Sequence, residues 1–128
     1  MKSKKIFSLC VMVFVVLLSG CGGSAGSSSS SSAYAPEMVE TGGVKYDQTC
    51  SACHGIDLQG VENLGKNLVD SEFVNSQSDD ELLTMIKTGR PTGHELNSTG
   101  IDMPPKGGNP ALGDDDIMAI IAYIRTSK

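Results

Sequence analysis

The sequence has few aromatic residues, few basic residues and no long apolar run. Its 128 residues include no tryptophan, three tyrosines and three phenylalanines, which excludes a core built mainly from large aromatic side chains. Ten lysines and arginines face fifteen acidic residues, and three of the ten stand at the very start, at Lys2, Lys4 and Lys5. From Cys21 onward the net charge is therefore −8. Such acidity, without a basic patch, excludes nucleic-acid binding and suits a protein partner with a basic docking face.

The N-terminus has the pattern of an export signal. Three lysines precede an apolar stretch over residues 6–18, which is too short to span a membrane comfortably and has the shape of a secretory signal. The stretch ends in Leu18-Ser19-Gly20-Cys21, which resembles the lipobox of bacterial lipoproteins, where the cysteine becomes the acylated first residue. We expect residues 1–20 to be a lipoprotein signal peptide and Cys21 to carry lipid. An ordinary signal with a chance cysteine is the alternative.

Residues 21–36 are predicted to be a tether. Six consecutive serines, Ser27–Ser32, and the neighbouring glycines cannot bury apolar surface and behave as flexible coil. A coil of this length spans about 20 Å r.m.s., so an anchored domain over residues 37–128 would rotate and reach outside the cytoplasm. Gly22 replaces the aspartate associated with inner-membrane retention, which favours the periplasmic face of the outer membrane in a cell with two membranes.

The chain is organised around Cys50-Ser51-Ala52-Cys53-His54. Two thiols three residues apart lie on one helical turn and a histidine follows at once, which is the spacing of a c-type haem attachment. Cys50 and Cys53 would each add to one vinyl group, and His54 would give the iron a nitrogen ligand. Three alternatives compete, namely a zinc site completed by His94, a thioredoxin-like dithiol and a simple disulfide. Zinc lacks a second cysteine pair, no strand–helix–strand pattern flanks the motif, and a disulfide leaves the histidine unexplained.

A first helix is expected from Thr41, as its cap, to about Cys53. Gly42 then shares one face with Tyr46 and both cysteines. Because glycine costs a helix about 1 kcal/mol relative to alanine, another backbone is expected to pass close to Gly42. That neighbour is predicted to be the last helix, whose Tyr123 would pack on the first.

Three further helices are predicted. A short one is expected near residues 71–75, and a second begins at Ser78, which has capping-box spacing to Glu81, and ends at Gly89. The last begins near Gly113 with three aspartates at its positive end. Its isoleucines recur with helical period and form an apolar stripe, at Ile117, Ile120, Ile121 and Ile124.

Two irregular segments are expected to complete the site. Residues 54–69 should supply a carbonyl that accepts a hydrogen bond from the His54 ring, near Asn63 and Leu64. Residues 90–112 form a long connection containing Met103-Pro104-Pro105, and loops of that length are usually functional. A thioether sulfur is a recognised second axial ligand of haem iron, and the two prolines would hold it in place. His94 in the same loop is the rival ligand, whereas Met85 fits core filling.

The combination resembles the small monohaem class I cytochromes c. The matching residues are Gly42 and Tyr46 ahead of Cys50-x-x-Cys53-His54, then Met103-Pro104, and a terminal helix reading Ile121-Ala122-Tyr123-Ile124. The resemblance implies an all-α fold of three to five helices around one covalently attached haem c, with crossed first and last helices. It implies thioether links at Cys50 and Cys53, axial ligation by His54 and Met103, and one-electron transfer between redox proteins without a small-molecule substrate.

Two features depart from the family. Many members have a Gly-Pro after the haem motif and a tryptophan near a propionate, whereas this chain has no proline between Pro36 and Pro91 and no tryptophan. Arg90 is therefore the candidate propionate partner, because guanidinium pairs well with carboxylates; a solvated arginine at the helix end is the alternative.

The sequence favours a lipid-anchored bacterial electron carrier in a respiratory or similar chain. Two other functions remain open. One is a haem-based ligand sensor or enzyme with an open or bis-histidine distal site, and the other is an electron-entry subunit of a larger oxidoreductase.

Overall fold

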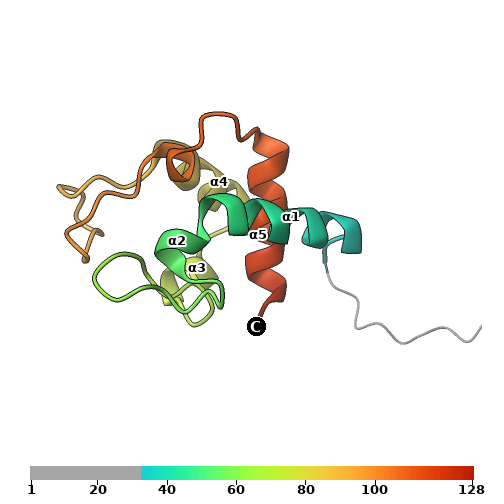
Figure 1. Ribbon diagram of the computed structural model, residues 1–128, viewed down its shortest axis with the longest axis horizontal. Helices are drawn as coiled ribbons and strands as arrows, with labels where there is room; N and C mark the ends of the chain where they lie inside the picture. Colours follow the sequence, from blue (N-terminus) through green and yellow to red (C-terminus); the bar gives the residue numbers. More distant parts are fainter. Residues whose placement is uncertain (1–32) are drawn as a thin grey trace, which may run out of the picture.

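The computed structural model describes residues 33–128, and the fold within this range is helical (Figure 1). The expected signal peptide, the lipidated Cys21 and the tether up to residue 32 lie outside the described residues. The elements are α1 (Pro36–Thr49), α2 (Ser51–His54), α3 (Glu72–Ser76), α4 (Asp79–Thr88), the 3₁₀ turn η1 (Pro105–Gly108) and α5 (Asp114–Thr126). Across residues 33–128 there is no strand, and only one isolated β-bridge occurs. The all-α prediction is therefore confirmed.

Helices α1 and α5 cross as expected (Figure 1). A Cβ built on Gly42 would lie 1.9 Å from the Ala119 carbonyl oxygen, so the two backbones touch at the glycine. One helical turn later the rings of Tyr46 and Tyr123 meet with their centroids 5.4 Å apart. The glycine on the first helix is thus explained by the close approach of the last helix.

The predicted start and end of the first helix were wrong. Thr41 lies inside α1, which begins five residues earlier at Pro36 after Ala35 as N-cap. Proline suits a first helical position because its φ is preset and the missing N–H has no partner there in any case. The helix also stops short of Cys53, because Cys50 closes α1 and a separate turn, α2, carries the rest of the motif.

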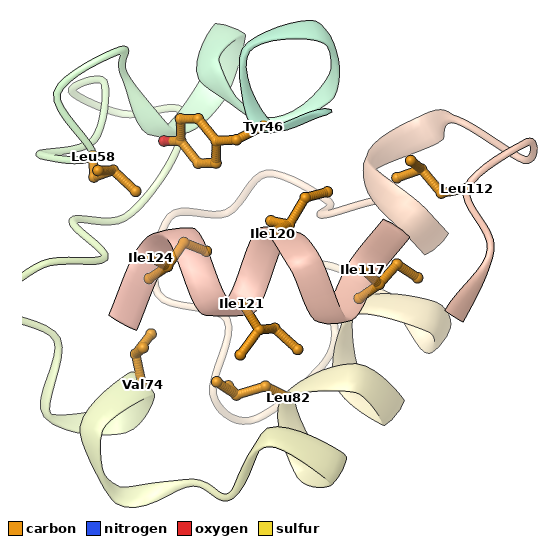
Figure 2. Packing of buried hydrophobic residues seen from close by; sticks show 9 residues of the cluster. All are labelled: Tyr46, Leu58, Val74, Leu82, Leu112, Ile117, Ile120, Ile121 and Ile124. Atoms are coloured by element: carbon orange, nitrogen blue, oxygen red, sulfur yellow. The ribbon is translucent and has the colours of Figure 1, made fainter. Parts of the chain in front are cut away.

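The hydrophobic core is built on α5 (Figure 2). Its four stripe isoleucines are all buried, as the periodicity predicts. Figure 2 shows Tyr46 of α1 on one side of this helix and Leu82 of α4 with Val74 of α3 on the other. Burying each such side chain stabilises the fold by about 1.5–3 kcal/mol relative to leaving it exposed. The core lies beside the haem-attachment motif, since Cys50 packs against it.

The middle helices begin and end where their capping residues predict. Ser71 caps α3 by accepting a hydrogen bond from the Val74 N–H. At α4 the Ser78 hydroxyl oxygen accepts from the Glu81 N–H at 3.3 Å, and the Glu81 carboxylate accepts from the Ser78 N–H at 2.7 Å. The Ser78 hydroxyl also donates to the Glu81 carboxylate at 2.8 Å, and the two hydrogen bonds that this carboxylate accepts from Ser78 hold the pKa of Glu81 below its usual value. Gly89, with φ of 73°, ends the helix.

In residues 33–128, none of the helices combines the length and the apolar character that a membrane crossing requires.

Candidate functional site

One apolar cleft brings together the residues on which the sequence analysis depends. Cys50, Cys53 and His54 line it from the α1–α2 corner, and Met103 and Arg90 line it from the long connection. Isoleucines of α5 and apolar residues of α3 and α4 form its floor, with Val74, Leu82, Ile86, Ile120, Ile121 and Ile124 among them. Side chains that lie about fifty residues apart in the sequence thus meet in one space.

The helical turn α2 places both thiols on the cleft. Its backbone continues from Cys50, whose carbonyl accepts from the N–H groups of Cys53 at 3.1 Å and of His54 at 2.9 Å. Burial raises the pKa of the Cys50 thiol to about 11, so the thiol is protonated at neutral pH. Both cysteines are free, which removes the disulfide alternative in this structure.

The zinc and dithiol alternatives do not fit the structure. Within the described part of the chain, no three His, Cys, Asp or Glu side chains come close enough to hold a metal ion together. His94 is exposed and does not line the cleft, and its Nδ1 accepts a hydrogen bond from the Leu96 N–H at 3.1 Å. A thioredoxin-like frame needs strands, and residues 33–128 contain none.

The His54 ring is oriented by a backbone carbonyl. Its Nδ1 lies 2.8 Å from the Lys66 carbonyl oxygen, and a carbonyl only accepts, so Nδ1 carries the proton and Nε2 keeps its lone pair. Burial lowers the pKa of His54, which favours the neutral imidazole that binds metals. A histidine that donates one N–H to a carbonyl is held in one tautomer and one orientation.

The carbonyl comes from the predicted loop, two residues beyond Leu64. Residues near Asn63 and Leu64 were predicted, but the loop first turns, with the Leu64 and Gly65 N–H groups both donating to the Val61 carbonyl. Gly65 then passes so close to Cys53 that an added Cβ would lie 2.1 Å from the Cys53 carbonyl oxygen. The chain reaches the imidazole only after this contact, at Lys66.

A second contact behind the motif was missed by the sequence analysis. The Tyr46 hydroxyl donates to the carbonyl oxygen of Gly55, the residue after His54, at 2.7 Å. Tyr46 is fully buried, and burial raises the pKa of its hydroxyl, which stays protonated as a donor. A tyrosine on a buried helix face needs a hydrogen-bond partner, and that need was the available signal.

Met103 is held at the cleft by a short β-bridge. The Arg90 N–H donates to the Met103 carbonyl at 2.8 Å, and the Met103 N–H donates to the Arg90 carbonyl at 2.9 Å. Gly89 makes room for this bridge, because a Cβ there would lie 2.4 Å from the Met103 carbonyl oxygen. Pro104 follows in the extended conformation that the prolines predict, with φ of −69° and ψ of 154°.

Two further side chains bear on the ligand assignments. Met85 packs against the core as expected but also lines the cleft, so a second thioether is present there. The Arg90 guanidinium lies over the Phe73 ring, 4.4 Å from its centroid, which holds a cation at the cleft.

The donor set fits a covalently attached haem. It comprises two free thiols one helical turn apart, a neutral imidazole with a fixed tautomer, and a thioether across the same cleft. The walls are mainly apolar, as a porphyrin requires, and Lys66 and Arg90 at the cleft are cations that suit its propionates.

Known proteins resemble this chain over most of its length. The family model described as cytochrome c oxidase, cbb3-type, subunit III matches residues 37–124. Cytochrome c-551 of Bacillus subtilis (strain 168) is 32% identical over 130 residues, covering 100% of this chain and 99% of its own length. The cbb3-type cytochrome c oxidase subunit FixP of Rhizobium meliloti (strain 1021) is 24% identical over 71% of this chain, and the chain spans only 28% of that protein.

Among solved structures, cytochrome CL of Methylophaga aminisulfidivorans MPT superposes with a TM-score of 0.50 at 26% sequence identity. The match covers 70% of this chain and 54% of the other. The family model, the full-length relative and this structure agree. The chain is therefore a member of the cytochrome c family, a small class I electron-transfer cytochrome that carries one covalently bound haem c.

Proposed function

We propose that the protein is a one-electron carrier with His54 and Met103 as axial ligands and thioether links at Cys50 and Cys53. The observation that supports this best is the shared cleft, in which a His54 ring oriented by the Lys66 carbonyl and the Met103 thioether line the same space. The haem supplies a one-electron couple when bound. With His54 and Met103 both bound to the iron, the closed form of the protein would offer no free coordination position to a small-molecule substrate.

The chain's own residues set the conditions for electron transfer. The Lys66 carbonyl keeps the His54 proton on Nδ1, which raises the basicity of the ring as a ligand. The apolar floor excludes water, and the β-bridge to Arg90 holds the Met103 backbone. The Arg90 guanidinium, held over Phe73, pairs with a propionate carboxylate in this proposal.

The ligand assignment is tested by the ferric absorption spectrum of the haem-loaded protein. Wild type should show the far-red charge-transfer band of a sulfur-to-iron bond, and Met103→Ala should lose it. Met85→Leu and His94→Ala are the matched controls, since the first removes the other thioether at the cleft and the second the rival imidazole. Loss of the band in Met85→Leu alone would move the ligand to α4. No band in wild type would favour an open or bis-histidine site, and carbon monoxide binding would then test a sensor or enzyme.

The protein is also proposed to be exported and lipid-anchored through Cys21. The supporting observations are the basic start, the short apolar stretch, the lipobox-like ending and the glycine- and serine-rich tether over residues 21–36. Cys21→Ala should abolish incorporation of labelled fatty acid and release the protein from the membrane fraction, whereas Cys10→Ala should leave both unchanged. In a cell with two membranes, fractionation should place the anchor in the outer one.

Redox proteins are the expected partners, and we propose a basic docking face on them. The acidic balance of the chain supports this, because complementary charge raises association rates and makes them fall with salt. Reversing several exposed acids should slow reduction by the partner at low ionic strength and flatten its salt dependence. Unchanged kinetics would mean that acidity serves solubility only.

An electron-entry subunit of an oxidase is the second candidate. The family model and the match to FixP favour it, although the chain spans only 28% of FixP. Affinity purification from native membranes distinguishes the two proposals. If an oxidase co-purifies with the cytochrome in stoichiometric amounts and stays bound at moderate salt, the cytochrome is a subunit of that oxidase. If the cytochrome is recovered alone, it is a free carrier.

A further inference from the structure

The segment between Arg90 and Met103 keeps its shape with little help from burial. Residues 91–96 are all exposed, and the apolar side chains of Leu96 and Ile101 are 50% and 44% exposed. Leu96 and Ile101 line the cleft, where a bound haem would cover them, so within the protein itself the segment gains little from burial and its conformation depends on polar contacts.

One side chain, that of Asn97, makes more of those contacts than any other in the segment. Asn97 is half-buried and lines the cleft. Its Oδ1 accepts from the Gly100 N–H at 3.0 Å and from the N–H and hydroxyl of Thr99 at 3.2 and 3.3 Å. Its Nδ2 donates to the Ile101 carbonyl at 2.8 Å, so both halves of the amide close the turn that leads to Met103.

The same amide reaches the bridge that carries Met103. Its Nδ2 also donates to the Arg90 carbonyl at 3.3 Å, and that carbonyl accepts the Met103 N–H at 2.9 Å. A second tie, from Thr92 to the Asp102 carboxylate, runs alongside it. Asn97 thus joins the turn at the tip of the segment to the backbone of Met103.

We propose that Asn97 is a positioning residue for the distal ligand, which keeps the Met103 thioether at the iron. The inference rests on the proposed ligation by Met103. An added ligand binds the ferric protein only in the fraction of molecules whose distal position is open, so its apparent affinity measures how firmly the segment is held. Removing the amide deletes several hydrogen bonds that hold the segment closed, so it should raise that fraction about tenfold or more.

The test is an imidazole titration of the ferric, haem-loaded full-length protein at a temperature well below unfolding. Binding is measured as the loss of the far-red band. Asn97→Ala should bind imidazole about tenfold more tightly than wild type. Asn97→Asp keeps the acceptors for Thr99 and Gly100 but loses both donors, so a smaller rise is expected, and it serves if the alanine variant fails to fold. Glu95→Gln, at an exposed position two residues earlier that does not line the cleft, is the matched control and should titrate like wild type.

The outcomes separate the two proposals. A wild-type band with unchanged imidazole affinity in both Asn97 variants would overturn the role of Asn97 and leave Met103 ligation standing. An equal rise in Glu95→Gln would also overturn it, because any change in the loop would then act alike. Absence of the band in wild type would overturn both proposals, because Asn97 cannot position Met103 as a ligand if Met103 does not bind the iron.

Discussion

Replacing Gly42 with alanine tests the α1–α5 crossing at its closest approach. The added Cβ would lie 1.9 Å from the carbonyl oxygen and 2.5 Å from the carbonyl carbon of Ala119, and 3.0 Å from the Tyr123 Cβ. A carbon and an oxygen normally approach to about 3.3 Å, so the helices must separate by more than about 1 Å. The atoms in the way are backbone, so no side-chain rotation relieves the clash.

The magnitude follows from two opposing effects. Overpacking a well-filled core typically costs about 1–3 kcal/mol, and the upper end applies where backbone must move. Alanine also improves helix propensity by about 1 kcal/mol over glycine. The net expectation for Gly42→Ala is a loss of about 2 kcal/mol in the free energy of unfolding, which lowers the Tm by about 8–16 °C in a domain of this size.

The adjacent glycine provides the control. A Cβ on Gly43 would lie 3.2 Å from the Tyr123 ring, which can shift by a few tenths of an ångström. Both substitutions gain the same propensity in the same helix, so their difference isolates the clash. Thermal and urea unfolding of the haem-loaded proteins should place Gly43→Ala near wild type or above it. Two variants that unfold within about 1 kcal/mol of each other would refute the crossing described above.

Three further changes test the site and the caps. Gly89→Ala puts a Cβ at a φ of 73°, 2.4 Å from the Met103 carbonyl oxygen, so the far-red band should weaken; Gly93→Ala, with nothing within 4 Å, should leave it intact. Tyr46→Phe removes the hydroxyl that donates to the Gly55 carbonyl, which should cost about 1 kcal/mol of unfolding free energy and shift the reduction potential; an unchanged potential would make the contact purely structural. Glu81→Ala should destabilise the protein at pH 7 but progressively less in acid. The pKa of Glu81 is lowered from its ordinary value of 4.5 by the hydrogen bonds from Ser78. Its contribution to the free energy of unfolding is therefore fully present above pH 4.5 and is lost as the pH falls through the folded-state pKa. A difference between Glu81→Ala and wild type that stayed constant down to pH 2 would contradict this.

The local features of this protein were determined by the sequence itself. The capping box at Ser78, the isoleucine stripe of α5 and the helical turn that places two cysteines and a histidine together all depend on residues within about four positions of one another. Even the contact at Gly42 was predictable, because a glycine on a buried helix face needs a neighbour that comes close. The all-α architecture was what the resemblance to class I cytochromes c implied, and the helices predicted from these patterns agree with it.

The partners of the site residues were decided only by the tertiary structure. Whether Asn63 or Lys66 meets His54 depends on the path of a loop that is set by the contact of Gly65 with Cys53. Likewise His94 and Met103 share one connection, and only the bridge to Arg90 places Met103 at the cleft while His94 stays outside. The physical reason is range: a cap or a stripe is complete within one or two turns, whereas a carbonyl or a sulfur finds its place through contacts between segments distant in the chain.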